Sequence, residues 1–317
     1  MPLTKTNRVW FGVLVTVTFA AFAAIFLLSC ERSEVKKIKL FQPVEKKEAA
    51  TQKIGLRVGI AAIISPKEGF IYYRELLDYL GEEISRPINL RHGNYDEINE
   101  LLGKGKLDLV FICSGPYIDA HRKFGSQLLV CPVVKGKSVY YANIIVHKDS
   151  PVKNFDQLRE KTFAFTHPLS ATGFIFPAYL LAQKGVKPQD YFSKTIFTNS
   201  HDNSVIAVAE KLVDGAAVDH IIYDHLAKTD PQLIKRTRVI ATSPPIGIPP
   251  IVVPKDLEPK LKKNLEDFFL NLDQEERGRQ ILAKLGIDRF VKPEDKWYDS
   301  LRSMKAAVEK TLASEEK

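Results

Sequence analysis

The chain contains little cysteine, with only Cys30, Cys113 and Cys131 among 317 residues. Three cysteines are too few for a disulfide scaffold, and their wide spacing fits no cysteine metal motif. Cys113 and Cys131 both lie in apolar, strand-like runs. Free buried thiols are common in such runs, although an oxidising compartment would also allow the two to pair. We therefore exclude a cysteine-built fold and favour two free thiols, with pairing left as the alternative.

Catalytic signatures are also missing. The sequence has no Gly-x-Ser-x-Gly elbow, no Walker loop and no Cys–His pair in a recognisable setting. His220 and His225 stand five residues apart. Two ligands on one helical face need a spacing of four, so we predict no metal site there. The carboxylates are spread along the chain without a recognisable acid–base pair. We therefore expect no enzyme and no cofactor.

Neither the basic nor the acidic residues are concentrated in one part of the sequence. The 46 basic and 38 acidic residues give a formal net charge of +8. The basic residues are scattered and are not interleaved with aromatic residues, so no nucleic-acid partner is predicted. A mild positive field would still help to collect small anions.

The longest apolar run lies near residue 1. Lys5 and Arg8 precede an uncharged stretch over residues 9–28, which ends in Leu-Leu-Ser-Cys at Cys30. A basic start, an apolar middle and a small-residue end predict an export signal over residues 1–30. The ending resembles the lipobox of bacterial lipoproteins, in which Cys30 would be lipidated. An uncleaved membrane anchor is the alternative. In both cases the rest of the chain would lie at the periplasmic or extracellular face, held at a membrane.

The remaining sequence predicts a tether followed by an α/β protein. Residues 31–52 are rich in Lys and Glu and have no useful periodicity, which indicates a solvated tether. From residue 54 onward, apolar strand-like runs alternate with stretches of helical spacing. Three amphipathic helical stretches follow, near residues 257–272, 275–285 and 297–312. This alternation predicts an α/β fold with mainly parallel sheet.

The order of elements predicts two lobes. Two extended segments, near residues 140–146 and 243–252, would cross between them, and proline stiffens the second. Lobe 1 would then comprise residues 54–142 and 250–317, and lobe 2 residues 143–249. A cleft between two hinged lobes is a usual place for a small ligand.

One corner of the chain has the chemistry of an anion site. After the strand-like residues 162–165, Ser170, Thr172 and Gly173 open a helical pattern. Free backbone N–H groups and the helix dipole favour an oxyanion at such a helix start. Simple capping of the helix by Ser170 or Thr172 is the alternative.

Six motifs follow one another along the chain: SPKEGFIYYRELLDYL, NYDEINELLGKGKLDLVFICSGPYIDA, YYANIIVHKDSPVKNFDQL, FTHPLSATGFIFPAYLLAQKGV, SHDNSVIAVAEKLVDGAAVDHIIYD and SPPIGIPPIVVPKDL. In this order they resemble the solute-binding components of phosphate/phosphite/phosphonate ABC importers, which are type II periplasmic binding proteins. The similarity runs from Ile54 to Leu285. The resemblance implies a two-lobed α/β fold with two hinge-crossing strands. It also implies a monomeric, membrane-anchored binding protein that passes a small phosphorus oxyanion to an ABC permease.

The resemblance also implies which residues bind the ligand. The family's oxyanion loop is matched by Ser170, Thr172 and Gly173. Four further positions match two tyrosines, a histidine and an aspartate of the family site: Tyr95, Tyr140, His201 and Asp219. No Lys or Arg falls among them, so the site would use neutral donors, and Asp219 would favour a ligand that still carries a P–OH proton.

Structural alternatives exist for each position. Tyr95 and Tyr140 would then be packing residues, while His201 and Asp219 would cap helices. Ser114 and Tyr117 are weaker candidates, because Ser-Gly-Pro is also ordinary turn chemistry.

Two departures from the family pattern limit the choice of ligand. Ala171 replaces a hydroxyl residue of the oxyanion loop, and Ile221 stands where similar aminoethylphosphonate binders carry a carboxylate. The resemblance therefore favours phosphate, phosphite or a simple phosphonate. The alternatives are a ligand-sensing subunit for a sensor kinase, and a binder or enzyme of the same fold that acts on another organic anion.

Overall fold

The structure is a computed structural model in which residues 55–314 are described, except the side chains of residues 66–68, 70 and 72. The predicted export signal over residues 1–30, the proposed lipid site Cys30 and the tether over residues 31–52 lie outside the described residues. Within the described part of the chain, no helix has the length and apolar character needed to cross a membrane.

The first part of the described chain alternates strands and helices as predicted. Asn94 starts a helix by accepting from the backbone N–H of Glu97 at 2.8 Å, and Gly125 ends one in the left-handed region at φ 68°. The elements are β1 (Leu56–Ala61), α2 (Pro66–Glu83), β2 (Ile88–Gly93), α3 (Tyr95–Gly103), β3 (Leu109–Phe111), α4 (Ser114–Phe124) and β4 (Gln127–Val133).

The middle of the chain forms a second set. Asp219 and Asp230 each start a helix by accepting a backbone N–H. The elements are β5 (Val139–Tyr140), β6 (Ala142–His147), η1 (Phe155–Leu158), β7 (Thr162–Phe165), η2 (Ala171–Ile175), α5 (Phe176–Ala182), α6 (Pro188–Tyr191), β8 (Lys194–Phe197), α7 (His201–Ala209), β9 (Gly215–Asp219), α8 (His220–Thr229), α9 (Pro231–Ile234) and β10 (Thr237–Thr242).

The last part begins with two short strands and contains the three amphipathic helices that the sequence predicts. The Glu258 carboxylate accepts from the N–H groups of Lys260 and Leu261 and so starts the first of these helices. The elements are β11 (Ile246–Gly247), β12 (Ile251–Val253), α10 (Pro259–Asn271), η3 (Leu272–Gln274), α11 (Glu276–Leu285), β13 (Arg289–Val291), η4 (Asp295–Tyr298) and α12 (Asp299–Ala313).

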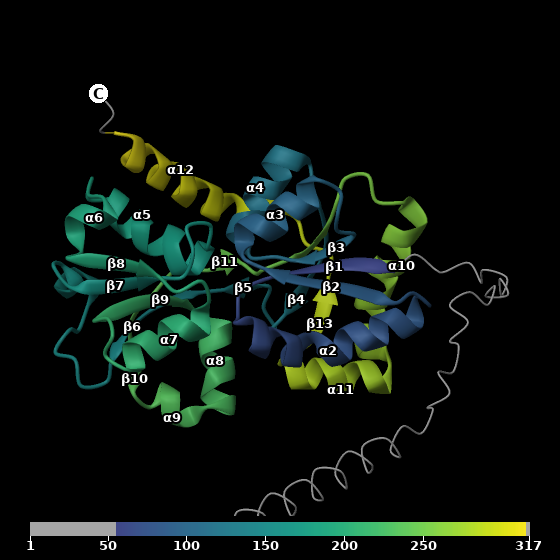
Figure 1. Cartoon of the computed structure of the whole chain (residues 1–317), viewed down its shortest axis with the longest axis horizontal. Helices are drawn as coiled ribbons and strands as arrows, with labels where there is room; N and C mark the ends of the chain where they lie inside the picture. Colours follow the sequence, from purple (N-terminus) through teal and green to yellow (C-terminus); the bar gives the residue numbers. More distant parts are fainter. Residues whose placement is uncertain (1–54, 315–317) are drawn as a thin grey trace, which may run out of the picture. The chain divides into compact units, whose positions relative to one another are not determined.

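The strands form two main sheets, each with its own helices (Figure 1). The six-stranded sheet has the order β13-β4-β12-β3-β1-β2, and the five-stranded sheet has the order β10-β6-β9-β7-β8. We call the six-stranded sheet with its helices the first lobe and the five-stranded sheet with its helices the second lobe. The α/β class predicted from the alternation is therefore confirmed.

The expectation of mainly parallel sheet is wrong. Within residues 55–314, only four of the ten strand pairings are parallel, namely β1–β2, β1–β3, β7–β8 and β7–β9. A crossover helix makes its two strands parallel. β6 and β12 instead enter their sheets after the chain has crossed from the other lobe, and both run antiparallel to their neighbours.

A two-stranded sheet joins the lobes at the crossing. β5 leaves the first lobe and β11 returns to it, and they pair antiparallel with Ile246 opposite Tyr140. Next to this pair, the Ser243 hydroxyl accepts from the Ala142 N–H at 2.9 Å, and the Ser243 N–H donates to the Ala142 carbonyl at 2.9 Å. The two hinge-crossing strands predicted from the sequence are therefore present and held in register.

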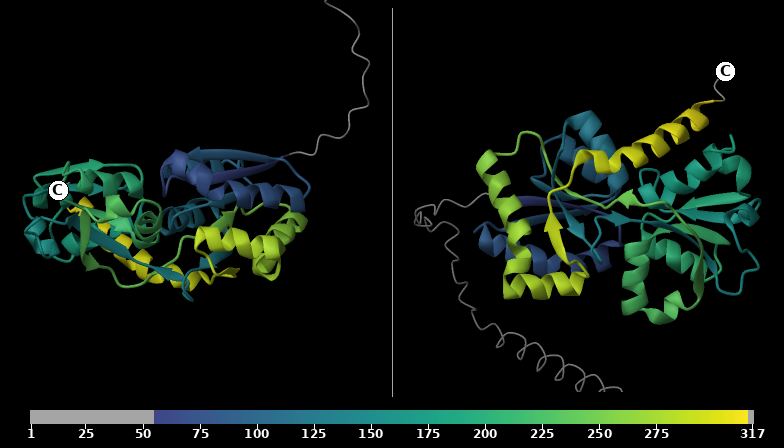
Figure 2. Two further views of the ribbon diagram at one scale, coloured as in Figure 1. Left: turned by 90° about the horizontal axis from the view of Figure 1, so that it is seen from below. Right: turned by 180° about the vertical axis from the view of Figure 1, so that it is seen from behind.

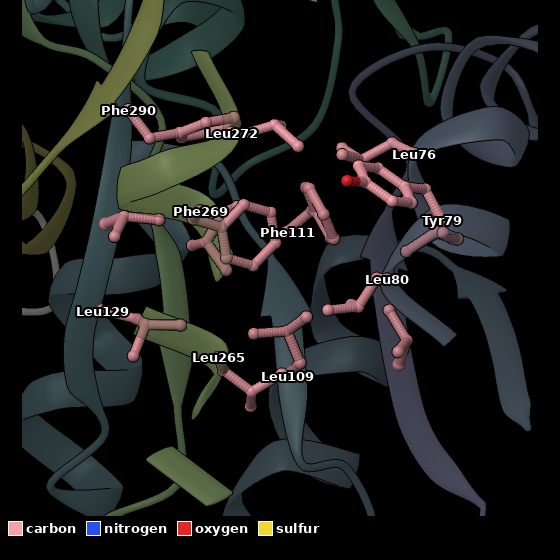
Figure 3. Packing of buried hydrophobic residues seen from close by; sticks show 14 of the residues in the cluster. Leu76, Tyr79, Leu80, Leu109, Phe111, Leu129, Leu265, Phe269, Leu272 and Phe290 are labelled. Atoms are coloured by element: carbon pink, nitrogen blue, oxygen red, sulfur yellow. The ribbon is translucent and has the colours of Figure 1, made fainter. Parts of the chain in front are cut away.

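The first lobe has a continuous apolar core between its sheet and helices α2, α10 and α11 (Figure 3). Leu76 and Leu80 of α2 and Phe269 of α10 are fully buried and face Phe111 of β3. The rings of Phe111 and Phe269 pack edge to face at 6.2 Å. This core packs β1 and β3 against the three helices.

Helix α12 belongs to neither sheet's core alone. It contacts α4 of the first lobe and packs against η2 and α5 of the second lobe, as Figure 1 and Figure 2 show. Its buried residues Leu301, Met304 and Val308 recur at helical spacing, which gives the contact its apolar face.

Candidate functional site

His201 stands at the first position of α7 and is fully buried. The backbone N–H of Asp219 donates to its Nδ1 at 3.1 Å, and Thr166 Oγ1 lies 3.1 Å from the same nitrogen. Burial lowers the pKa of His201 to about 3, so the ring is neutral at pH 7. Because Nδ1 accepts, the proton of the neutral ring resides on Nε2, which therefore faces Ser170 as a donor.

Ser170 caps the helix that follows it. Its Oγ accepts the Gly173 N–H at 3.0 Å and lies 3.5 Å from His201 Nε2. The capping alternative is thus correct for Ser170, but capping uses only the acceptor capacity of its hydroxyl. Since Oγ accepts from both groups, the hydroxyl proton of Ser170 is left to donate elsewhere. Thr172 makes no such cap, and its Oγ1 is buried without a hydrogen-bond partner.

The helix that follows Ser170 begins with a widened turn, and Gly173 and Pro177 explain this geometry. Pro177 has no N–H, so the Gly173 carbonyl loses its normal partner four residues on and accepts from the Thr166 N–H at 3.2 Å instead. The turn widens accordingly into the π-helix η2, in which the Ile175 N–H reaches the Ser170 carbonyl at 2.9 Å. A Cβ on Gly173 would lie 2.3 Å from Thr166 Oγ1, so only glycine fits.

Tyr95 and Tyr140 approach from the first lobe and the hinge. Both rings are buried, and burial raises the pKa of each phenol well above its usual value, with Cys113 and Asp219 raising it further. Tyr140 Oη lies 3.5 Å from Cys113 Sγ, whereas Tyr95 Oη has no hydrogen-bond partner. A buried phenol without a partner costs free energy, which a bound acceptor would recover.

Asp219 ends β9, is 1% exposed and caps α8 through its Oδ1, which accepts the Ile221 N–H at 2.7 Å. Burial raises its pKa to about 7, although the N–H groups of Ile221 and Ile222 lower it in part. Asp219 therefore caps a helix and also holds a proton near neutral pH. The capping alternative and a ligand role are compatible in this residue.

The seven residues of the predicted site are thus brought together, and all are buried. Tyr95 and Tyr140 come from the first lobe and the hinge, and the other five from the carboxyl edge of the five-stranded sheet. None carries a permanent positive charge. Of the weaker candidates, Ser114 donates to the Gly247 carbonyl at 2.6 Å, and the Tyr117 hydroxyl bonds Asp295, so both are engaged in structural contacts.

Cys113 lies among the candidate site residues, and sequence reasoning did not select it. Its thiol is free, as is that of Cys131, so the expectation of two free thiols is confirmed. Burial raises the pKa of Cys113, while the Tyr140 hydroxyl and the N–H groups of Ala171 and Gly115 lower it in part. The sulfur therefore lies among the site residues. The available signal was its position directly after the β3 run, at the carboxyl edge where sites form.

Comparison of folds places the protein in a class. The structure resembles a binding protein component of an ABC phosphonate transporter from Pseudomonas aeruginosa, with a TM-score of 0.78, 22% identity and coverage of 83% of this chain and 89% of the other. It also resembles PhnD1 from Prochlorococcus marinus in complex with methylphosphonate, with a TM-score of 0.73, 21% identity and coverage of 80% and 98%. The chain therefore has the two-lobed fold of periplasmic binding proteins.

Sequence comparison then shows the family. The chain matches the family described as ABC transporter, phosphonate, periplasmic substrate-binding protein, over residues 58–298. It is 27% identical over 276 residues to the phosphonates-binding periplasmic protein of Escherichia coli, covering 85% of this chain and 78% of that protein. The chain belongs to this family of periplasmic substrate-binding proteins. Since these are transport proteins, the expectation that it is not an enzyme is confirmed.

The raised pKa of Asp219 predicts how stability depends on pH. Its folded-state pKa of about 7 exceeds the ordinary 3.8, so the folded protein holds this proton more tightly than the unfolded chain. The stability due to protonated Asp219 is present below about pH 4 and is lost as pH rises towards 7. Asp219→Asn keeps an oxygen for the cap and removes that loss. We expect the variant to gain up to about 4 kcal/mol over wild type between these limits.

Urea denaturation of both proteins from pH 4 to pH 8 measures this difference. His201 changes stability with the opposite sign in the same range, but it does so in both proteins and cancels. A difference between variant and wild type that stays constant with pH would contradict the raised pKa of Asp219.

Proposed function

We propose that the chain is the extracytoplasmic binding lipoprotein of an ABC importer and that it binds a small phosphorus oxyanion in a cleft between its lobes. The ligand would be phosphate, phosphite or a simple phosphonate. Membership of the phosphonate family supports the transport role, and the similarity to a protein crystallised with methylphosphonate agrees with the ligand class. The observation that carries the proposal is that two of the seven candidate residues, Tyr95 and Thr172, have buried hydroxyls without partners.

The donors match a phosphorus oxyanion in number and kind. Tyr95, Thr172 and Ser170 offer hydroxyl protons, and the Nε2–H of His201 leaves the serine proton free by donating to Ser170 Oγ. These groups are neutral and preorganised, so they stabilise negative charge in a low-dielectric site without a counter-ion. Asp219 then selects among anions. When charged, its carboxylate accepts a hydrogen bond from a P–OH group, and when protonated it donates one. A fully ionised anion such as sulfate has no proton to donate, so charged Asp219 repels it.

The lobes would close on the ligand by a hinge motion. We propose lobe 1 as residues 54–142 with 250–317 and lobe 2 as residues 143–249. Two contacts support a closed arrangement: the His201 N–H donates to the Ile63 carbonyl at 3.1 Å, and the Ser65 N–H donates to Asp202 Oδ1 at 3.0 Å. Both join the segment after β1 to the start of α7. A ligand that contacts both lobes would shift the population towards this state.

The anchor and the partners follow from the predicted export signal. We propose that Cys30 is lipidated, that residues 31–52 tether the domain to the membrane, and that a monomer delivers its ligand to an ABC permease. The Leu-Leu-Ser-Cys ending supports lipidation. A tether of this composition would let the domain reach the permease.

Calorimetry on the purified full chain tests the ligand class. We expect binding of at least one of phosphate, phosphite and methylphosphonate, and none of sulfate. Tyr95→Phe should weaken that binding about ten- to hundredfold, because it removes a hydrogen bond to a charged ligand. It should not lower stability, because Tyr95 Oη has no partner in the protein.

The matched control is Tyr191→Phe. Tyr191 is also buried, but its hydroxyl donates to the carbonyls of Phe155 and Asp156, away from the site. This variant should keep wild-type affinity. Absence of binding to every phosphorus compound would overturn the proposed function, and unchanged affinity in Tyr95→Phe would remove Tyr95 from the site.

Thiol alkylation tests the closure. Cys113 lies beside the hinge residue Tyr140 and the Ala171 N–H of the second lobe, whereas Cys131 lies within β4, between β12 and β13 of one sheet. Opening of the lobes should expose only Cys113. We expect saturating ligand to slow N-ethylmaleimide labelling of Cys113 at least tenfold, and Cys131 to stay unlabelled in the folded protein. Peptide mass mapping distinguishes the two cysteines. A labelling rate of Cys113 that does not change when ligand is bound would refute the closure.

Mass analysis of the protein from membranes tests the anchor. We expect the mature chain to begin at Cys30 with attached acyl chains, and Cys30→Ser to release the domain from washed membranes. A Cys30→Ser protein that stays membrane-bound with residues 1–29 still attached would instead support the uncleaved anchor.

A further inference from the structure

The loop between β7 and η2, residues 166–170, contacts the first lobe at two points. At the first, the Leu169 carbonyl approaches Gly115 of α4 so closely that a Cβ on this glycine would lie 2.0 Å from the oxygen. At the second, His167 Nε2 lies 3.2 Å from Asp96 Oδ2, at the start of α3. This loop of the second lobe therefore lies against two helix starts of the first lobe.

The contact between His167 and Asp96 is a directed hydrogen bond. His167 Nδ1 accepts the Leu169 N–H at 3.2 Å. Burial lowers the pKa of His167, although Asp96 raises it in part, so the ring is neutral at pH 7. Because Nδ1 accepts, the single ring proton resides on Nε2 and is donated to the Asp96 carboxylate. A hydrogen bond to a charged acceptor is stronger than one between neutral groups.

The same contact covers part of the Tyr95 ring. The rings of His167 and Tyr95 pack with their centroids 4.9 Å apart. The His167 side chain is 8% exposed and that of Asp96 is 66% exposed, so the pair joins the lobes at the solvent edge of the site. Tyr95 Oη has no hydrogen-bond partner among the described residues, so packing alone positions this ring.

Opening of the lobes would break only one of these two hydrogen bonds of His167. The bond to Leu169 lies within the loop and moves with it, whereas the bond to Asp96 crosses between the lobes. The interlobe bond therefore stabilises the closed arrangement and contributes nothing to the open one. Such a contact shifts the population of the two states without touching the ligand.

We propose that His167 and Asp96 form a latch between the lobes, which holds the closed state over Tyr95 and slows release of the ligand. The inference rests on the binding function proposed above and adds a contact that sets the stability of the closed state. Both residues act through the position of the lobes and of Tyr95, so they are positioning residues.

A double-mutant cycle on the purified full chain tests the latch. Calorimetry would use whichever of phosphate, phosphite and methylphosphonate binds the wild type most tightly. We expect Asp96→Ala to weaken that binding about tenfold, because a hydrogen bond to a carboxylate is lost. In His167→Ala protein, the same change should weaken it at most about twofold, since the partner is already gone. Asp96→Asn keeps an acceptor oxygen and should lose less affinity than Asp96→Ala.

The cycle also removes an unrelated effect of these changes. Asp96 lies in the first turn of α3, where a carboxylate favours the helix dipole. Its loss there is the same in both backgrounds and cancels in the comparison.

Thiol labelling tests the latch without any ligand. Cys113 lies beside the hinge residue Tyr140 and the Ala171 N–H of the second lobe, so its N-ethylmaleimide rate follows the open population. We expect Asp96→Ala and His167→Ala each to label Cys113 about tenfold faster than wild type, with no further gain in the double variant.

His147 and Asp149 provide the matched control. His147 Nδ1 lies 3.5 Å from Asp149 Oδ2, and the two side chains are 11% and 62% exposed, close to the values of the latch. Both residues belong to the second lobe, at the end of β6. Asp149→Ala should therefore change neither the ligand affinity nor the labelling rate of Cys113.

The outcomes separate the two proposals. If a phosphorus oxyanion binds but Asp96→Ala has the same effect with and without His167, the latch is refuted while the proposed function stands. If none binds, the proposed function fails and the labelling rates decide the latch. Equal rates in wild type, Asp96→Ala and His167→Ala would then refute it.

Discussion

The hydrogen bond from the Asp219 N–H to His201 Nδ1 is the constraint on which the site depends. It joins the end of β9 to the start of α7, and it decides which imidazole nitrogen carries the proton. With that proton on Nε2, the ring acts as a donor towards Ser170, which in turn frees the serine hydroxyl proton. The same residue, Asp219, supplies the carboxyl that holds a proton near neutral pH. One strand end thus fixes the tautomer of His201 and carries the carboxyl of Asp219.

Much of the fold was predictable because apolar periodicity and turn residues are local signals. The alternation of strands and helices, the two crossing segments and the three last helices all follow from such patterns. The strand directions were not predictable in this way. The directions of β6 and β12 depend on the crossings between the lobes, which no local pattern records. The π-helix η2 was also missed. Its cause, the missing N–H of Pro177, is visible in the sequence, but the acceptance of the Thr166 N–H by the Gly173 carbonyl depends on tertiary packing.

The site was predictable to a different degree. The order of motifs pointed to seven residues, and the fold brings them together from distant parts of the chain. The residue types alone could not tell which hydroxyls have partners, since Ser170 caps a helix while Thr172 does not. The residue types also gave no reason to select Cys113, because a cysteine in an apolar run has the same sequence pattern whether it faces a core or a site. Burial and pairing are tertiary properties, so these distinctions needed the structure.

Ala171 and Cys113 are best understood together. Ala171 lacks the hydroxyl that the family pattern places there, but its backbone N–H remains and acts on the sulfur of Cys113. A thiol is a weak donor and a polarizable, largely apolar neighbour. In the proposed site, a weak thiol donor beside Tyr140 therefore lies next to the position where the resemblance predicts a hydroxyl donor. For the phosphorus oxyanion that we propose as the ligand, Ala171 leaves one hydroxyl donor fewer in a site that has no permanent cation.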